Sequence, residues 1–332
     1  YYVVKNRAYK NIILLIASLL FYMWGEPQFI VVMVCEVLLD YSAARLIVYF
    51  AEKKKALLKK ICMFSAILCN LGVLCFFKYM GFIVGNVNQF CGSRFVFPDH
   101  TLPIGISFFT FQAMSYVIDV YRGRVQAQIS LYKVMLYISF FPQLIAGPIV
   151  RYSDVIDAID NRGESLEQFA SGCSRFIVGL AKKVLLADVL AVLANLILNN
   201  EELLHTNFAK MSIVGAWMGA LAYTLQIYFD FSGYSDMAIG LGRMFGFEFR
   251  ENFNYPYMAS SIKDFWRRWH ISLSSWFRDY VYIPLGGNRK GNRITIRNLC
   301  IVWILTGLWH GASWNFVLWG GIWFVLILIE DA

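Results

Sequence analysis

Long apolar runs separated by short polar breaks dominate the chain of 332 residues. A membrane-spanning helix needs roughly 20 apolar residues, and several runs reach that length. We therefore predict an all-α, polytopic membrane protein with about eight to ten membrane-embedded helices, some of them interfacial or re-entrant. The expected apolar runs cover residues 11–24, 28–50, 61–77, 102–121, 131–149, 169–198, 211–229, 237–247 and 294–329.

One apolar run contains residues that break a helix. Residues 140–148 include Pro142, Gly147 and Pro148, and two prolines with a glycine disfavour a continuous helix. Broken backbone survives in a membrane only where protein or a water-filled cavity surrounds it. This stretch is therefore predicted to be re-entrant or kinked, and buried among helices.

A second polar interruption falls at residues 230–236, which we expect to separate two apolar runs. Asp230 and Asp236 in this stretch either bind a neighbouring helix or line an internal passage. Residues 151–167 are mixed in character and are predicted to form a linker.

Composition supports a membrane location over a soluble core. Hydrophobic residues make up 58% of the chain and charged residues only 16%, whereas a soluble domain has about 25% charged residues. The length favours one membrane domain over residues 1–332. We expect this domain to be trimmed at both ends, since the chain starts without a methionine and stops just after an apolar run.

The formal net charge of +8 is concentrated in short basic blocks between the apolar runs, at residues 53–60 and 289–293. The positive-inside rule explains such blocks as cytoplasmic loops, so no nucleic-acid partner is expected. The seven cysteines form no Cys-x-x-Cys pair, which predicts neither a metal site nor a disulfide framework. His100 and His205 lie in loop-like surroundings and are assigned no role.

Residues 262–283, IKDFWRRWHISLSSWFRDYVYI, are too charged to span a membrane and predict an amphipathic interfacial helix. At helical spacing an apolar and a polar stripe lie side by side. The apolar stripe holds Phe265, Trp269, Leu273, Trp276 and Tyr280, and the polar stripe holds Arg267, His270, Ser274 and Arg278. Tryptophan and arginine at an interface commonly serve as anchors only. His270 differs, because nearby arginines disfavour its protonation and a neutral imidazole can both accept and donate a hydrogen bond.

A second histidine, His310, lies between two apolar runs and is flanked by Gly307 and Gly311. Ionisable residues at membrane depth are costly and are candidates for function. A neutral buried histidine can act as a base near neutral pH. The alternative is a histidine that only forms a hydrogen bond between helices, and the residues alone do not decide between the two.

Five segments together carry a family resemblance. They are LPIGISFFTFQAMSYVIDVYRG (102–123), FFPQLIAGPIVRY (140–152), YFDFSGYSDMAIGLGRMFGF (228–247), NFNYPYMASSIKDFWRRWHISLSSWFRDYVYIPLGGNRKG (252–291) and GLWHGASWNFVLWG (307–320). In this order they resemble the membrane-bound O-acyltransferase family, and most closely its bacterial branch of alginate and other polysaccharide O-acetylases.

The resemblance implies helices around a central tunnel, with His310 as the catalytic histidine and His270 as the second histidine of the active site. In this interpretation His310 is the general base for an attacking hydroxyl, and His270 positions the donor or stabilises developing charge. The expected substrate-binding residues lie on the same two segments. They are Trp266, Arg267, Ser274, Arg278, Asp279, Trp309, Trp314 and Asn315.

The resemblance also implies the substrates. No bound cofactor is expected, and the donor is acetyl-CoA or an acyl carrier thioester on the cytoplasmic side. The acceptor is the hydroxyl of an exported or cell-surface polysaccharide, reached with an extracytoplasmic acetyltransferase as partner. Besides membrane lipids these are the expected partners, and the expected location is the bacterial cytoplasmic membrane, crossed several times.

Three alternatives remain at this stage. The first is D-alanyl transfer to teichoic acid, by a related branch of the same family. The second is a transporter, which broken helices and intramembrane acids would suit. The third is a non-catalytic scaffold for polysaccharide export.

Overall fold

The computed structural model describes residues 1–98, 101–198 and 211–331. Within these residues every regular element is helical, which confirms the predicted all-α fold. Three helical stretches in the described ranges are long and apolar enough to cross a membrane, namely Arg7–Gly25, Ala56–Cys91 and Trp314–Asp331. The larger number of embedded helices stays a prediction, and His100 and His205 lie outside the described residues.

The chain divides into two compact units, which are described separately. Unit 1 contains Tyr1–Ile145, Ile149–Asn161 and Phe253–Ala332, and unit 2 contains Ala146–Pro148 and Arg162–Asn252. The histidines of interest both belong to unit 1.

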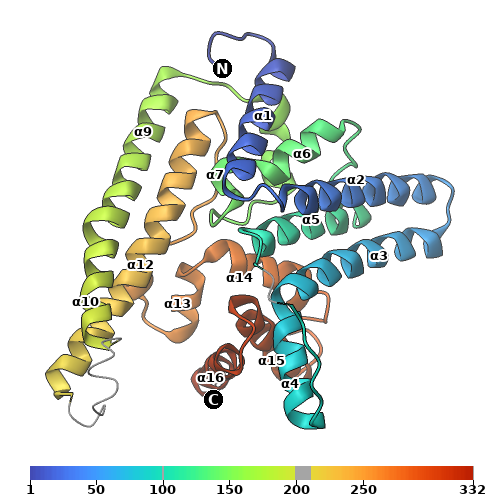
Figure 1. Cartoon of the computed structure of the whole chain (residues 1–332). Coiled ribbons are helices and arrows are strands. Elements are labelled where there is room, and N and C mark those ends of the chain that lie inside the picture. The colour runs from blue at the N-terminus through green and yellow to red at the C-terminus, as the bar shows by residue number, and fades with distance from the viewer. Residues whose placement is uncertain (99–100, 199–210, 332) are drawn as a thin grey trace. The chain divides into compact units, whose positions relative to one another are not determined.

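The N-terminal part of unit 1 is built around the buried helix α5 (Ile106–Tyr121). Helix α2 (Ile30–Glu52) and helix α3 (Ala56–Leu74) pack against α5 and against each other, as Figure 1 shows. Two pairs of buried polar side chains inside this group are hydrogen-bonded between helices, which offsets part of their desolvation. Asn70 donates to Asp40 at 2.8 Å, and Thr110 donates to Glu36 at 3.1 Å.

The predicted break in residues 131–149 is confirmed. Helix α6 (Leu131–Ser139) ends before Phe140, and the one-turn helix α7 (Phe141–Leu144) follows, with Pro142 near its start. Helix α1 (Arg7–Gly25) packs against both.

The linker predicted at 151–167 is partly wrong, because it contains helix α8 (Tyr152–Asn161). Tyr152, Val155 and Ile159 are its buried residues and repeat at helical spacing. The acidic residues between them masked this short amphipathic pattern.

Unit 2 is a group of long, closely packed helices. Helix α9 (Leu166–Ala181) continues through the π-helical turn η2 (Lys182–Ala187) into α10 (Asp188–Leu198). Helix α12 (Ile213–Met244) runs beside them, as Figure 1 shows. A Cβ atom added to Gly179 would lie 2.6 Å from the carbonyl oxygen of Gly233, so these two helices approach backbone to backbone.

The interruption predicted at residues 230–236 is wrong, since α12 is continuous there. Its acids bind cations of the neighbouring helix, which was one of the two roles considered for them. Asp230 accepts from Lys183 at 2.5 Å, while Asp236 accepts from Arg175 at 2.8 Å and from Lys182 at 2.6 Å. These ion pairs let the carboxylates remain on an unbroken helix.

The C-terminal part of unit 1 begins with a short 3-10 turn, η4 (Pro256–Met258). The single amphipathic helix predicted over 262–283 is wrong. The segment forms α13 (Ile262–Arg268), α14 (Ile271–Phe277) and the π-helical turn η5 (Arg278–Tyr282).

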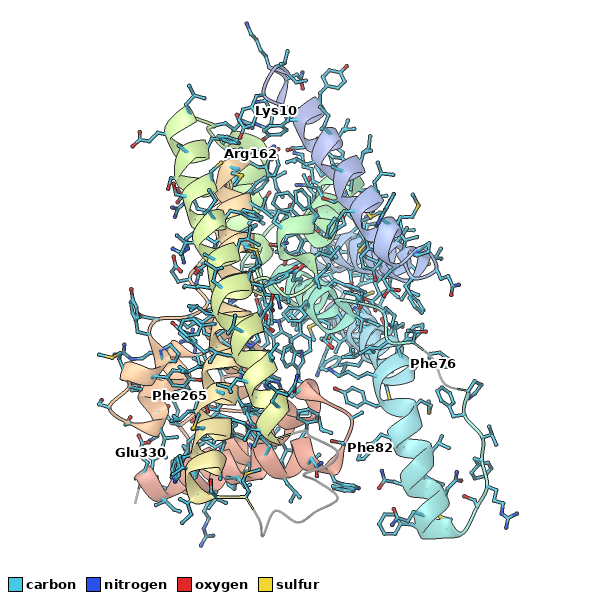
Figure 2. All side chains as sticks on the ribbon, turned by 60° about the vertical axis from the view of Figure 1, so that its left-hand side comes forward. Lys10, Phe76, Phe82, Arg162, Phe265 and Glu330 are labelled. Carbon is cyan, nitrogen blue, oxygen red and sulfur yellow. The ribbon has the colours of Figure 1, made fainter. Side chains whose placement is uncertain are left out.

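The two apolar runs predicted within 294–329 are confirmed as helices α15 and α16. Helix α15 (Asn292–His310) and helix α16 (Trp314–Asp331) pack against each other as a hairpin. Figure 2 labels Phe265 on α13 and Glu330 near the end of α16; Glu330 accepts a hydrogen bond from the backbone of Lys263 on α13 at 3.1 Å.

Candidate active site

The break between α13 and α14 falls at His270. Its backbone adopts a left-handed conformation, with φ 43° and ψ 55°. Such a conformation is uncommon outside glycine, although histidine adopts it more readily than most residues. The side chain is 2% exposed. Backbone strain of this kind clusters at functional sites, where the surrounding structure holds it in place.

Helix α15 ends at His310, the second candidate histidine. Close helix packing fixes this end, because a methyl group on Gly307 would overlap the carbonyl of Phe316 on α16. A methyl group on Gly311 would overlap the ring of Phe316. The His310 ring lies edge-on to Trp319, with centroids 4.8 Å apart. The two glycines thus allow α16 to press close to the turn that carries His310.

Both histidines line one cavity, of about 310 Å³. Its walls come from α13, α14, η5, α15 and α16, all in unit 1. Six of the predicted site residues line it, namely His310, His270, Trp266, Arg267, Ser274 and Arg278. The fold thus brings these six residues, predicted from two separate segments of the sequence, to one cavity.

Trp309 connects the two histidines. Its ring centroid lies 5.6 Å from that of His270 and 5.0 Å from that of His310. The indole N–H groups of Trp309 and Trp266 are buried, and neither has a hydrogen-bond acceptor among the described residues. A buried donor without an acceptor costs about 1–3 kcal/mol. Trp266 lines the cavity, so its N–H is suited to bind a polar atom of a ligand, whereas Trp309 is not among the lining residues.

Cationic side chains also face this cavity, from Lys263, Arg267 and Arg278. Lys263 forms an ion pair with Asp331, and Arg278 donates to Asp279 at 2.8 Å. Arg267 is exposed and forms no ion pair among the described residues. The cavity therefore combines two imidazoles with positive charge.

Asp279 does not line this cavity and is bound by arginines. Arg151 lies 2.7 Å from Oδ2 of its carboxylate, and Arg278 lies 2.8 Å from Oδ1. Burial would raise the pKa of Asp279, but the hydrogen bonds from Arg278 and Arg151 outweigh it and hold the pKa below its usual range. Tyr280 beside it donates to Asp119 at 2.6 Å. This network joins η5 to α5 and to the segment before α8.

Trp314 and Asn315 are exposed and are not among the cavity-lining residues. The Trp314 indole donates to Asn86 on α4 at 2.8 Å. The catalytic and binding roles of all ten predicted residues stay predictions.

Three residues beside the histidines were not predicted from the sequence. The Trp319 ring contacts that of His310, and Lys78 and Tyr79 donate hydrogen bonds to the carbonyls of Trp309 and Leu308. Trp319 was hidden among the apolar residues of its helix. Lys78 carried a detectable signal, because it is the single charged residue between Ile61 and Cys91, and ionisable residues inside an apolar span are functional candidates.

Comparison with known proteins identifies the family. The profile of the membrane-bound O-acyltransferase family matches residues 122–332. The chain is similar to the protein named "Probable alginate O-acetylase AlgI" of Pseudomonas aeruginosa, with 44% identity over 98% of this chain and 62% of the relative. It is also similar to the peptidoglycan O-acetyltransferase of Helicobacter pylori, with 36% identity over 95% of this chain and 63% of the relative.

A more distant likeness is to the teichoic acid D-alanyltransferase of Bacillus subtilis, with 30% identity over 67% of this chain and 58% of the relative. The chain spans 62% of the length of the Pseudomonas aeruginosa relative and 63% of the Helicobacter pylori relative. The extent of the profile match and the identity to the acetylases agree with the motifs in the sequence: the chain belongs to the membrane-bound O-acyltransferase family.

Proposed function

We propose that this chain is the catalytic membrane part of an O-acetyltransferase. In this proposal the enzyme moves an acetyl group from a cytoplasmic thioester, acetyl-CoA or an acyl carrier, toward a hydroxyl of an exported or cell-surface polysaccharide. The observation that carries the proposal is the single cavity lined by both His270 and His310. The similarity to relatives named as alginate and peptidoglycan O-acetylases supports acetyl as the group transferred.

The proposed chemistry is a direct acyl transfer. The acceptor hydroxyl oxygen attacks the thioester carbonyl carbon while His310 takes the hydroxyl proton as general base. The C–O bond forms, the C–S bond breaks, and the departing thiolate receives the proton back from the histidine. A hydrogen-bond donor aimed at the developing oxyanion would lower the barrier, and the buried indole N–H of Trp266, which lines the cavity, is suited to that role.

The charges of the cavity favour an anionic donor. Lys263, Arg267 and Arg278 line it, and cationic side chains are the usual partners of phosphate groups. Both proposed donors carry their thiol on a phosphate-bearing arm. His270 lies deeper, at 2% exposure, and would position the thioester beside His310.

The proposed setting follows from the same family resemblance. We place the protein in the bacterial cytoplasmic membrane, crossed several times, with an extracytoplasmic acetyltransferase that passes the group onward. Candidate membrane-crossing helices at Arg7–Gly25, Ala56–Cys91 and Trp314–Asp331 support a membrane location.

The test is histidine replacement in the full-length protein. General-base catalysis contributes roughly 10²–10⁴-fold, so His310→Ala should abolish measurable acetylation of cell-surface glycans at unchanged protein level. Glu167→Gln, an exposed change on α9, is the matched control and should acetylate normally. Mass spectrometry of the glycans reads out the added group.

Near-normal acetylation by His310→Ala at equal protein level would overturn the proposal. Alanyl in place of acetyl on the glycan would assign the chain to the D-alanyl branch instead. Normal glycan export and acetylation in the His270→Ala and His310→Ala double variant would support a scaffold, which needs neither histidine.

A further inference from the structure

A lysine lies within one of the candidate membrane-crossing stretches, Ala56–Cys91. Lys78 belongs to the π-helical turn η1 (Cys75–Tyr79), which joins α3 to α4 (Met80–Cys91) without a break. Figure 2 labels Phe76 in this turn and Phe82 one to two turns further along α4. Single π-helical turns inside α-helices occur frequently at functional sites. A charged residue within an apolar span is energetically costly and is therefore a candidate for function.

The two polar residues of this turn both bind the end of α15. Lys78 donates a short hydrogen bond from Nζ to the carbonyl oxygen of Trp309. Tyr79 donates from its hydroxyl to the carbonyl oxygen of Leu308 at 2.8 Å. A second hydrogen bond of Lys78, to Ser107 Oγ on α5 at 3.0 Å, ties the ammonium to the core of unit 1.

These bonds satisfy groups that the helix itself cannot satisfy. The last four carbonyls of an α-helix have no N–H partner within the helix, and in α15 only Gly307 among them accepts from a following backbone N–H, that of Gly311 at 3.3 Å. Leu308 and Trp309 are the next two residues. A positive charge at a helix C-terminus is favourable, and an unsatisfied carbonyl in apolar surroundings is energetically costly. Lys78 and Tyr79 therefore cap the turn that carries His310.

The same ammonium also faces the ring that joins the two histidines. Lys78 Nζ lies 5.5 Å from the centroid of the Trp309 ring, within the range of a cation–π contact. The ammonium is also close enough to His310 to interact with it electrostatically. One side chain thus contacts both the backbone and the ring of the residue that precedes His310.

We propose that Lys78 and Tyr79 are positioning residues, which hold the C-terminal turn of α15 and so orient His310 in the cavity. This inference rests on the proposed function, since it assigns them a role through His310. Neither lines the cavity shared by the histidines, so their effect is on geometry and charge at the site. Misplacing a catalytic group by about 1 Å can cost roughly 100-fold in rate.

The test compares Lys78→Met, Lys78→Arg and Tyr79→Phe in the purified full-length protein, with acetyl transfer measured against donor concentration. Lys78→Met should lower kcat by roughly 10- to 100-fold, with KM for the donor within about two-fold because donor-contacting residues are untouched. Lys78→Arg keeps the charge and the donors and should recover most of the rate. Tyr79→Phe, which removes one cap, should lower kcat by a smaller factor.

Ser65→Ala is the matched control, because Ser65 lies in the same stretch and donates only to Cys62 of its own helix. It should leave kcat unchanged.

The outcomes separate the two proposals. A Lys78→Met variant with wild-type kcat, while His310→Ala is inactive, overturns the positioning role and leaves the proposed function standing. A reduced amount of folded Lys78→Met protein with normal kcat per folded molecule overturns the positioning role too, because the hydrogen bonds of Lys78 would then contribute to stability only. Activity in His310→Ala would overturn the proposed function first.

Discussion

In the helix pair α9–α12, acidic side chains within apolar surroundings lie against cations. Asp236 is bound by Arg175 and Lys182, and Asp230 by Lys183. In the cavity of about 310 Å³ the polar groups are arranged differently. Two imidazoles line it together with Trp266, whose buried indole N–H has no hydrogen-bond acceptor among the described residues.

The two regions differ in whether their polar side chains are paired within the protein or left available to a ligand. Charges that are paired across helices reduce their own desolvation cost and tie the helices together, and this leaves no strong group for a ligand. Buried polar groups without partners are costly, and those that line a cavity are candidates for contact with a ligand. Packing differs in the same sense, since Gly179 and Gly233 bring α9 and α12 into backbone contact, whereas the cavity is open.

Placing a leucine side chain in each region should give the largest difference between them. Gly179→Leu puts a side chain where a Cβ atom would already lie 2.6 Å and 2.7 Å from backbone atoms of Gly233 and Met237. Overpacking typically costs about 1–3 kcal/mol and occasionally more, and backbone cannot move aside, so we expect most folded protein to be lost. Ser274→Leu instead extends into the cavity and should abolish acetyl transfer at a near-normal folded amount.

Fluorescence-detected size exclusion of the full-length protein measures the folded amount, and glycan acetylation measures transfer. Gly321→Leu is the control for Gly179→Leu, because a Cβ atom there meets nothing within 4 Å. Equal losses of folded protein in Gly179→Leu and Ser274→Leu would mean that the two regions do not differ in free space.

Neutralising a paired acid should have a smaller effect, confined to stability. Asp236→Asn leaves Arg175 and Lys182 without their shared carboxylate, and these cations are 30% and 28% exposed. Solvent screening reduces the penalty below that of a fully buried pair, to roughly 2 kcal/mol. Thermal unfolding in detergent should show the loss, while transfer per folded molecule stays at the wild-type value.

Glu251→Gln is the matched control for this change. Glu251 binds the same Arg175 but is 52% exposed, so its loss should cost less than about 1 kcal/mol. A fall in transfer per folded Asp236→Asn molecule would place Asp236 in the reaction instead of the scaffold.

Hydrophobic periodicity predicted the helices well but misjudged polar residues that have partners elsewhere in the chain. The break at 230–236 was expected because local sequence cannot reveal that Lys182 and Lys183 lie beside Asp230 and Asp236. The opposite error occurred at His270, where helical spacing continues through a residue whose backbone is left-handed. Both errors arise because tertiary contacts decide whether the local pattern is kept.

The two histidines of the candidate site were easier to predict from the sequence than the residues that hold the end of α15. His270 and His310 stand out as histidines near or within apolar segments, and the family resemblance joins them. The hydrogen bonds of Lys78 and Tyr79 depend on a π-helical turn and on carbonyls more than 200 residues away in the chain. Hydrophobic periodicity predicts neither of these.

The smallest expected effect concerns pH and His270, which lies between two seven-residue helices too short to span a membrane. Burial, with a further contribution from His310, holds its pKa well below the usual value. Above the pKa of about 6.5 expected for a histidine in the unfolded chain, His270 is neutral in both the folded and the unfolded protein. Below that pKa only the unfolded chain gains the proton. The free energy of unfolding therefore falls as the pH is lowered, by about 1.4 kcal/mol at pH 5.5. His310, which lines the same cavity, is present in both proteins compared. Thermal unfolding of wild type and His270→Gln at pH 7.5 and 5.5 should show the larger acid loss in wild type. Equal losses would mean that His270 becomes protonated in the folded protein as readily as in the unfolded chain, and the cavity would then carry a further positive charge instead of a neutral imidazole.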